Sequence, residues 1–185
     1  MITDLSLPIL GERVAIRRLV EADLSNLYDL EIDEEVKRYV GGPVKTPREA
    51  WIDGMRNNLG PLEPTLVVTS RKDGTFIGRA SLTQTNHLPI EWEIRVLIAR
   101  QYWGPRFGRE VSRLLIDAGF NRLHATALVA VFDSENKPSQ ALVDSFGFQH
   151  ACTKTPDELG RTKLVFKLRR ERYNKGMQAT AYGGA

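Results

Sequence analysis

A glycine turn joined directly to an amphipathic helix, at residues 102–120 (YWGPRFGREVSRLLIDAGF), places the tightest constraint on the fold of this chain. Gly104 permits a positive φ or a close approach of another group, and Pro105 suits a first helical position. The first amides of such a helix have no partner within it and lie at the positive end of its dipole. The segment is therefore predicted to bind an anion, and a phosphate would suit it.

Apolar residues behind the turn recur at helical spacing, which predicts that the turn is rigidly backed by a core. The members of this stripe are Phe107, Val111, Leu114, Leu115 and Ala118.

Periodicity divides the rest of the chain into alternating strands and helices. Val14 and Ile16 indicate a first strand, Glu21 begins a helix, and Pro47 begins a second helix that ends at Gly60-Pro61. Three antiparallel strands are then predicted at 65–70, 76–83 and 91–98, with a hairpin turn at Asp73-Gly74. After the glycine turn and its helix come a strand at 123–132, a helix between Pro138 and Gly147, and a closing hairpin at 148–153 and 162–168.

This order of elements predicts one α+β domain over residues 1–173, with a mixed sheet and helices on its faces. From about Asn174 to Ala185 the apolar pattern is lost in the segment NKGMQATAYGGA, which is predicted to be a disordered tail. His124 and Tyr173 carry no motif, and we assign them to a sheet edge and to the tail respectively.

Composition excludes several classes of function. The balance of 26 Lys+Arg against 23 Asp+Glu gives a net charge of +3, which is too small and too interspersed to indicate nucleic acid as a partner. No apolar run reaches the roughly 18 residues of a membrane span, so we expect a soluble, cytoplasmic protein with no membrane partner. Cys152 is the only cysteine, which leaves no disulfide and no cysteine-based metal site. We expect it to be a buried strand residue, and we discount a dyad with His150.

Two separate motifs resemble the GNAT acyltransferase superfamily, and most closely its branch of ribosomal-protein N-terminal acetyltransferases and some antibiotic acetyltransferases. In that branch a strand ending in Glu-Ile leads into a Tyr-Trp-Gly turn, as Glu93-Ile94 precedes Tyr102-Trp103-Gly104 here. The family pattern Glu-Asn-x-x-Ser, a helix and Gly-Phe matches Glu135-Asn136, Ser139 and Gly147-Phe148. The match covers roughly residues 10–170.

The resemblance implies a GNAT-like fold whose mixed sheet is splayed at its centre, with acetyl-CoA as the cosubstrate, an amine as the acceptor and no metal. It places the pyrophosphate on the amides of the turn at 104–108 and the pantetheine arm between two parting strands. An unpaired amide near Val96 or Leu97 would stabilise the oxyanion. The cofactor-binding residues implied are Val96, Leu97, Gln101, Gly104, Pro105, Arg106, Phe107, Gly108, Arg109 and Asn136.

The turn departs from the family pattern at one position. That pattern is usually Gln/Arg-x-x-Gly-x-Gly/Ala, and Arg106 stands where the second small residue is expected. Its side chain could obstruct the pyrophosphate, or its guanidinium could turn outward and pair with a phosphate, as could that of Arg109. We favour the outward arrangement. The alternative for both arginines is a solvated helix face.

Glu93 and Ser139 are the candidate catalytic residues. The resemblance implies that a carboxylate at Glu93 deprotonates the amine through water and that the Ser139 hydroxyl bonds and protonates the departing sulfur. Glu91 shares a strand face with Glu93 and is the next base candidate, and His87 is a lesser one. Structural alternatives stand beside each: a solvated strand face for the glutamates, a helix-capping hydroxyl for Ser139, and a turn-forming role for Asn136.

The predicted function is acetyl transfer from acetyl-CoA to a primary amine by direct attack. The acceptor would be a protein N-terminus or a small amine, with choice governed by the early helices, the loop at 34–46 and the closing hairpin. The acidic run from Asp29 to Glu35 would attract a cationic amine, or it is simply a solvated helix end. The alternatives are an aminoglycoside-detoxifying acetyltransferase and a non-catalytic acyl-CoA-binding domain. Pairing into a homodimer through sheet edges is compatible with the sequence.

Overall fold

The computed structural model describes residues 5–59, 65–85, 90–104, 106–156 and 160–175 of the chain. Pro105, His87, the predicted helix end at Gly60-Pro61 and most of the predicted tail lie outside this description. Two early helices precede a meander of three strands, as the sequence predicts. The elements run β1 (Ile9–Leu10), β2 (Val14–Arg18), η2 (Glu21–Asp23), α1 (Leu24–Ile32), α2 (Glu34–Lys37), α3 (Arg48–Asn58), β3 (Thr65–Ser70), β4 (Phe76–Gln84), β5 (Glu91–Ile98), η3 (Arg100–Tyr102), α4 (Phe107–Asn121), β6 (Ala127–Asp133), α5 (Lys137–Ser145), β7 (Gln149–Thr153) and β8 (Lys163–Arg169).

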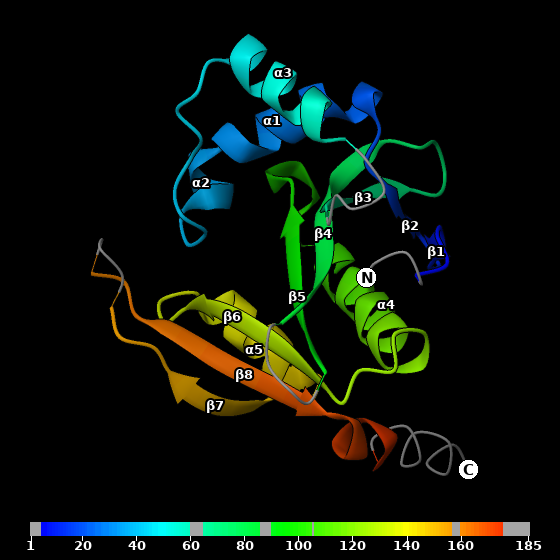
Figure 1. The fold of residues 1–185 in the computed structure, drawn as a ribbon, viewed down its shortest axis with the longest axis vertical. Helices are drawn as coiled ribbons and strands as arrows, with labels where there is room; N and C mark the ends of the chain where they lie inside the picture. Colours follow the sequence, from blue (N-terminus) through cyan, green and yellow to red (C-terminus); the bar gives the residue numbers. More distant parts are fainter. Residues whose placement is uncertain (1–4, 60–64, 86–89, 105, 157–159, 176–185) are drawn as a thin grey trace.

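The strands form one mixed sheet in the order β1-β2-β3-β4-β5-β6-β8-β7. Every neighbouring pair is antiparallel except β5 and β6, which are parallel because α4 crosses over between them. Figure 1 shows α1 and α3 on one side of β4 and β5, with α4 on the other side. The predicted α+β fold, with a mixed sheet and helices on both faces, is confirmed.

The sheet is splayed at its centre, between β5 and β6. Their register covers only Glu91 to Glu93 against Ala127 to Val129, although both strands continue well beyond these residues. On its other edge β5 pairs with β4 from Trp92 to Ile98, and β6 pairs with β8 along its whole length. Each of the two strands therefore follows its antiparallel partner, and the two separate from each other (Figure 1).

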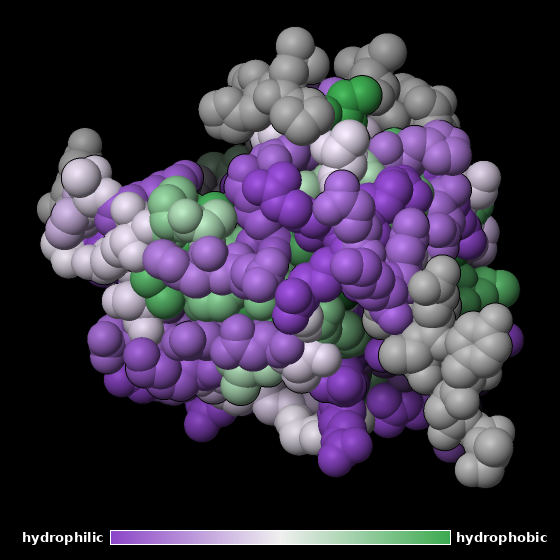
Figure 2. Space-filling model, turned by 90° about the horizontal axis from the view of Figure 1, so that it is seen from below, coloured by the Kyte–Doolittle hydropathy of each residue, from purple (hydrophilic) through white to green (hydrophobic). Residues whose placement is uncertain are grey.

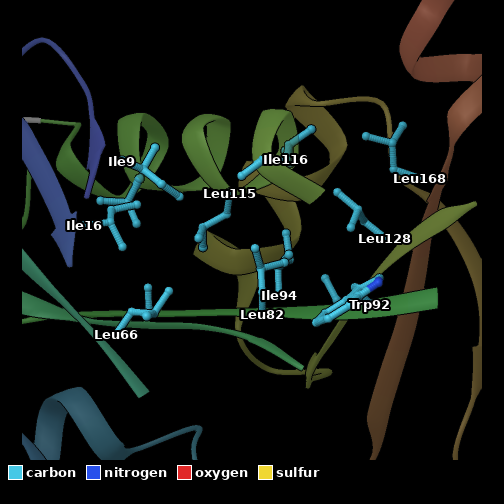
Figure 3. Close-up of a cluster of buried hydrophobic side chains, with 14 of the residues drawn as sticks. Ile9, Ile16, Leu66, Leu82, Trp92, Ile94, Leu115, Ile116, Leu128 and Leu168 are labelled. Atoms are coloured by element: carbon cyan, nitrogen blue, oxygen red, sulfur yellow. The ribbon is translucent and has the colours of Figure 1, made fainter. Parts of the chain in front are cut away.

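The main core lies between the sheet and α4. Leu115 and Ile116 of this helix are buried over Leu82, Ile94 and other sheet residues, as Figure 3 shows. The buried stripe of α4 explains why a helix forms directly behind the glycine turn, because each of its apolar side chains leaves water as it packs. The helix axis, and with it the position of the turn, is thereby fixed against the sheet.

A hydrogen-bonded carboxylate ties the first turn of α4 to β2. Glu110 accepts hydrogen bonds from the backbone N–H of Arg13 at 2.8 Å and from that of Val14 at 3.3 Å, and the Arg13 side chain adds an ion pair. Burial alone would raise the pKa of Glu110, but these hydrogen bonds outweigh it and hold the pKa below its ordinary value. The carboxylate therefore stays charged and braces the start of the helix.

A second cluster of buried side chains covers the opposite face of the sheet. Leu27 and Leu30 of α1 and Val36 of α2 pack there with Ala99, and Leu97 of β5 lies against them. This cluster positions α2 and the following loop beside the end of β5. The sequence did not predict α2 or β1 as separate elements, because both are too short to show periodicity.

The surface view in Figure 2 is mostly hydrophilic, with hydrophobic residues in narrow strips between polar ones. Within the described residues no helix is long and apolar enough to cross a membrane.

Two sequence predictions about the strands in the second half of the chain need correction. The strand predicted from Leu123 begins at Ala127, since His124 has a positive φ of 52° and breaks the extended backbone. Cys152, predicted to be buried, is exposed, because β7 is an edge strand whose five residues are all exposed. His150 faces Thr153 across 3.1 Å and stacks edge-on against Phe166.

Tyr173 is not part of a tail. Its ring stacks on Phe120 with centroids 4.6 Å apart, and its hydroxyl donates a hydrogen bond to Asp117. Burial and that hydrogen bond raise the pKa of Tyr173 above its ordinary value. Residues 170–175 are helical, so ordered structure continues past the predicted boundary at residue 173.

Gly78 on β4 allows the close approach of β5 at the edge of the splay. A Cβ added there would lie 2.1 Å from the carbonyl oxygen of Leu97, which real structures do not tolerate. We expect Gly78→Ala to lower the free energy of unfolding by about 1–3 kcal/mol, because the backbone of one strand must move. Urea titration followed by circular dichroism measures the change.

Gly54→Ala is the matched control, because Gly54 lies in α3 and a Cβ added there would have no atom within 4 Å. It should raise stability by up to about 1 kcal/mol, as alanine favours helix more than glycine does. Equal stability of Gly78→Ala and wild type would show that the strands approach less closely than this geometry requires.

Candidate active site

A large cleft opens where β5 and β6 diverge. Its volume is about 1260 Å³, and it reaches both faces of the sheet. One wall comes from the first turns of α4 and α5, and the other comes from α2 and the loop after it, at residues 35–41. The cleft therefore offers two approaches to the same strands, one from each side of the sheet.

The register of β5 decides which of its backbone groups face the cleft. The N–H of Ala99 bonds to the carbonyl of Ile77, and the N–H of Thr85 bonds to that of Glu91, so odd-numbered residues of β5 exchange hydrogen bonds with β4. The even-numbered Val96 therefore directs its N–H away from β4, past the point where β6 pairs. The amide of Leu97 faces β4 instead, so of the two predicted oxyanion donors only Val96 has the required direction.

The predicted anion-binding turn has the conformation expected of it. Gly104 has a φ of 95°, and nothing lies within 4 Å of the position that a Cβ would take. No side chain caps the start of α4, so the amides of Phe107, Gly108 and Arg109 head the helix. Gly104, Phe107 and Gly108 line the cleft, and these donors meet it from the face that carries α4.

Arg106 is the N-cap residue of α4, and it adopts the left-handed conformation with a φ of 64°. The side chain is exposed and lines the cleft. Arg109 also lines the cleft, but its guanidinium donates a hydrogen bond of 2.6 Å to Ser145 and lies 5.0 Å from the ring of Phe146. Arg109 is thus held against the C-terminal end of α5.

Gln101 and the two aromatic residues before Gly104 differ in position. Gln101 is exposed on η3 and is not among the residues that line the cleft. Tyr102 packs edge-on against Phe107, the first residue of α4, with ring centroids 6.0 Å apart. Trp103 is half exposed, and its indole N–H donates a hydrogen bond of 2.8 Å to the carbonyl of Ile98, which faces the cleft.

Asn136 and Ser139 stand together at the start of α5, on the cleft wall. The side-chain oxygen of Asn136 accepts a hydrogen bond from the backbone N–H of Ser139 at 3.1 Å and so caps the helix. Asn136, not Ser139, is therefore the capping residue. Within the described residues the Ser139 hydroxyl has no hydrogen-bond partner, and the amide nitrogen of Asn136 has none either.

The two glutamates of β5 have different surroundings, although both lie on the same face. Glu91 is buried and binds the ammonium of Lys167 through both oxygens, at 2.9 and 2.8 Å. Glu93 lines the cleft and pairs with the exposed Arg95 at 2.8 Å. Glu91 is therefore part of a structural ion pair, and only Glu93 is accessible from the cleft.

A family model described as an acetyltransferase (GNAT) domain matches residues 13–149, which is most of the chain. The chain belongs to the GNAT acetyltransferase family. This N-acetyltransferase is 26% identical over 159 residues to an uncharacterized N-acetyltransferase, p20, of Bacillus licheniformis, with 83% of this chain and 89% of that protein covered.

Solved GNAT structures share the fold at low sequence identity. An acetyltransferase of Bacillus anthracis superposes with a TM-score of 0.78 at 16% identity, covering 89% of this chain and 99% of that one. A spermidine N-acetyltransferase from Vibrio cholerae, in complex with CoA and spermine, gives the same TM-score, identity and coverage. These likenesses confirm the GNAT fold, and GNAT acetyltransferases use acetyl-CoA.

Sequence reasoning missed Arg79 of β4, which lines the cleft of this N-acetyltransferase beside Leu97. Its guanidinium bonds to Glu31, a buried residue that also pairs with buried Lys37. No motif marks Arg79, because in the sequence it is one polar residue in a strand whose polar and apolar residues alternate. Only the pairing of β4 with β5 brings it beside the splay. Within the described residues no cluster of three or more metal-ligating side chains occurs.

Two substitutions of Asn136 separate its role as the cap of α5 from a role in binding acetyl-CoA in this N-acetyltransferase. Asn136→Ala removes the cap of α5 and should lower the free energy of unfolding by about 1 kcal/mol. Asn136→Asp keeps a capping oxygen but loses the amide donor, so its stability should match wild type. If the amide nitrogen binds the pantetheine arm, both variants should bind acetyl-CoA more weakly in calorimetric titration. Unchanged affinity for acetyl-CoA in Asn136→Asp would show that the residue caps α5 and does not bind the pantetheine arm.

Proposed function

We propose that the cleft binds acetyl-CoA from the α4 side and a primary amine from the α2 side, and that the amine attacks the acetyl group directly. The observation that carries this proposal is the placement of Glu93 at the last residue of β5 that pairs with β6, and of Val96 on the splayed part just beyond it. Their side chains lie on opposite faces of the strand, and the open amide of Val96 lies at its edge. Donor and acceptor would thus meet through the gap in the sheet.

The donor half of the site fits a phosphate-bearing ligand. The uncapped amides at the start of α4 and the open space above Gly104 would hold the pyrophosphate, since these donors have no partner among the residues that the structure describes. Arg106 would add a charge-assisted hydrogen bond from the cleft rim. The free edge of β5, with the N–H of Val96, and the amide nitrogen of Asn136 would bind the amides of the pantetheine arm.

Acetyl-CoA, when bound, supplies an acetyl thioester, and the residues of the chain supply the proton transfers and the charge stabilisation. Glu93 would take a proton from the incoming amine through a water molecule. The N–H of Val96 would stabilise the negative charge that develops on the thioester oxygen. The Ser139 hydroxyl would donate a hydrogen bond to the departing sulfur.

A second candidate function is supported by the ion pair between Glu93 and Arg95. An amine or a water molecule must compete with the Arg95 guanidinium for the Glu93 carboxylate, which favours a domain that binds acyl-CoA without turning it over. Among acceptors, the likeness to a spermidine N-acetyltransferase supports a small amine. The two motifs at Tyr102-Trp103-Gly104 and Glu135-Asn136 support a protein N-terminus, as in the ribosomal-protein branch, or an aminoglycoside.

Binding of acetyl-CoA is tested by calorimetric titration of wild type and Gly104→Glu. The variant places a carboxylate where the pyrophosphate would lie, and we expect it to weaken binding by at least about tenfold through like-charge repulsion. Lack of binding to wild type would reject both candidate functions.

Gly74→Glu is the matched control, because Gly74 also has a positive φ, 75°, with no atom within 4 Å of a Cβ position. It lies in the turn between β3 and β4 and does not line the cleft. The control therefore carries the same backbone strain and the same added charge. An equal loss of affinity in the two variants would contradict the phosphate assignment.

Catalysis by Glu93 is tested with Glu93→Gln and Arg95→Gln, using the amine that gives the highest rate of CoA release in a broad screen. Both variants break the ion pair, but only the first removes the carboxylate. We expect kcat to fall by about 10²-fold or more in Glu93→Gln. The fall in Arg95→Gln should be smaller than this by a factor of at least about ten. Similar kcat values for the two variants would show that Glu93 is not the base. If neither the variants nor the wild type release CoA with any amine, the second candidate function, a non-catalytic acyl-CoA-binding domain, is favoured.

A further inference from the structure

Positive charge dominates the walls of the cleft. Within the described residues two glutamates, Glu35 and Glu93, face it. The cationic side chains that line it are Arg38, Arg79, Arg95, Arg106, Arg109, Arg161 and Lys163. Arg106 and Arg109 adjoin the phosphate turn and would be offset by the charges of acetyl-CoA. Lys163 is paired with Asp133, and Arg79 and Arg95 lie on the face of the sheet that carries α1 and α2, where the acceptor would enter.

Three carboxylates of the acidic run that the sequence offers for a cationic acceptor have partners within the protein. Asp29 pairs with Arg48, and Asp33 caps α2 by accepting hydrogen bonds from the N–H groups of Glu35 and Val36. Glu31 is buried between two cations. These three carboxylates are therefore not available to recognise a polyamine or another cation.

Glu31, Lys37 and Arg79 form a cluster with an uncompensated positive charge. Glu31 and Lys37 are each 7% exposed, and one carboxylate cannot neutralise both cations. Arg79 is bound to Glu31 through Nε, and its side chain is 20% exposed. Within the described residues its Nη1 and Nη2 atoms have no hydrogen-bond partner. An oriented guanidinium with two unused terminal donors is suited to a bidentate carboxylate.

Arg79 is also close to the proposed point of attack. It pairs directly with Leu97 across β4 and β5, so about 4.8 Å separates the two strands at the residue that follows Val96. Arg79, Leu97 and Glu93 share one face of the sheet, on the side of α1 and α2. A group bound to Arg79 would therefore lie beside the residue next to Val96, and Glu93 stands on the same face four residues away, roughly 13 Å along β5.

We propose that the acceptor is a small amine that carries a carboxylate, as an amino acid does, and that Arg79 is the specificity-determining residue that binds this carboxylate. The inference rests on the proposed acetyl transfer and narrows its acceptor. Glu31 orients the guanidinium, and the anionic substrate offsets the excess charge of the cluster. Arg38, exposed on the rim 5.4 Å from the ring of Tyr39, adds attraction at the entrance.

The first test compares free amino acids with their α-amides, with β-alanine and γ-aminobutyrate to vary the spacing and spermidine as a cation. CoA release by the wild-type enzyme is measured at saturating acetyl-CoA. At least one carboxylate-bearing amine should have a kcat/KM about tenfold or more above that of its amide and of spermidine. The amide has the more readily deprotonated amine, so a preference for the acid reports recognition of the carboxylate.

The second test uses Arg79→Gln, Arg79→Lys and the control Arg100→Gln, which alters an exposed arginine that does not line the cleft. For the preferred acid, Arg79→Gln should raise KM about tenfold to a hundredfold, with the affinity for acetyl-CoA unchanged. Arg79→Lys should restore part of the loss, because it keeps the charge but not the paired donors. Arg100→Gln should behave as wild type, and thermal unfolding identifies any variant that fails to fold.

The outcomes separate this inference from the proposed function. No binding of acetyl-CoA would reject the transferase itself. Two outcomes would overturn the carboxylate inference alone, provided that acetyl-CoA binds. One is turnover of amides or spermidine at rates equal to or above those of the acids. The other is no turnover of any acid. An unchanged KM in a folded Arg79→Gln variant would remove Arg79 from the acceptor site.

Discussion

The separation of β5 from β6 is the constraint on which the site depends. Three residue pairs join these parallel strands, while each is held along nearly its full length by an antiparallel neighbour. Beyond Glu93, the backbone groups of β5 that point away from β4 consequently have no strand partner among the described residues, and an unpaired amide in a cleft is a ready donor for a ligand. The close contact of Gly78 with the carbonyl of Leu97 holds β5 on the β4 side of this gap.

The two faces of the sheet give the cleft two chemically different walls. On one face the uncapped start of α4 and the cap of α5 present backbone and side-chain donors suited to a phosphate-bearing arm. On the other face α1 and α2 surround Glu31, whose two cationic partners leave positive charge beside β5. Because the gap between β5 and β6 connects the two walls, a donor bound on one face of the sheet can meet an acceptor bound on the other.

Local rules predicted much of the donor side. The turn at Gly104, the helix behind it and the short helix after Asn136 were all predicted, because glycine conformation, apolar spacing and capping act over a few residues. The direction of the Val96 amide was not predictable, since it depends on the register with β4. Arg79 and the pairing of Glu91 with Lys167 also escaped prediction, because their partners lie far away in the sequence.

The sequence by itself determined the order of the longer strands and helices, the glycine turn ahead of α4 and the GNAT membership carried by two short motifs. Tertiary structure alone decided how the charges are used. Asp29, Glu31 and Asp33 read as an acidic surface, yet each has an internal partner, and the cleft they adjoin is basic. The physical reason is that the effect of a charge depends on which groups surround it in space, and folding brings residues from distant segments of the chain together around this cleft.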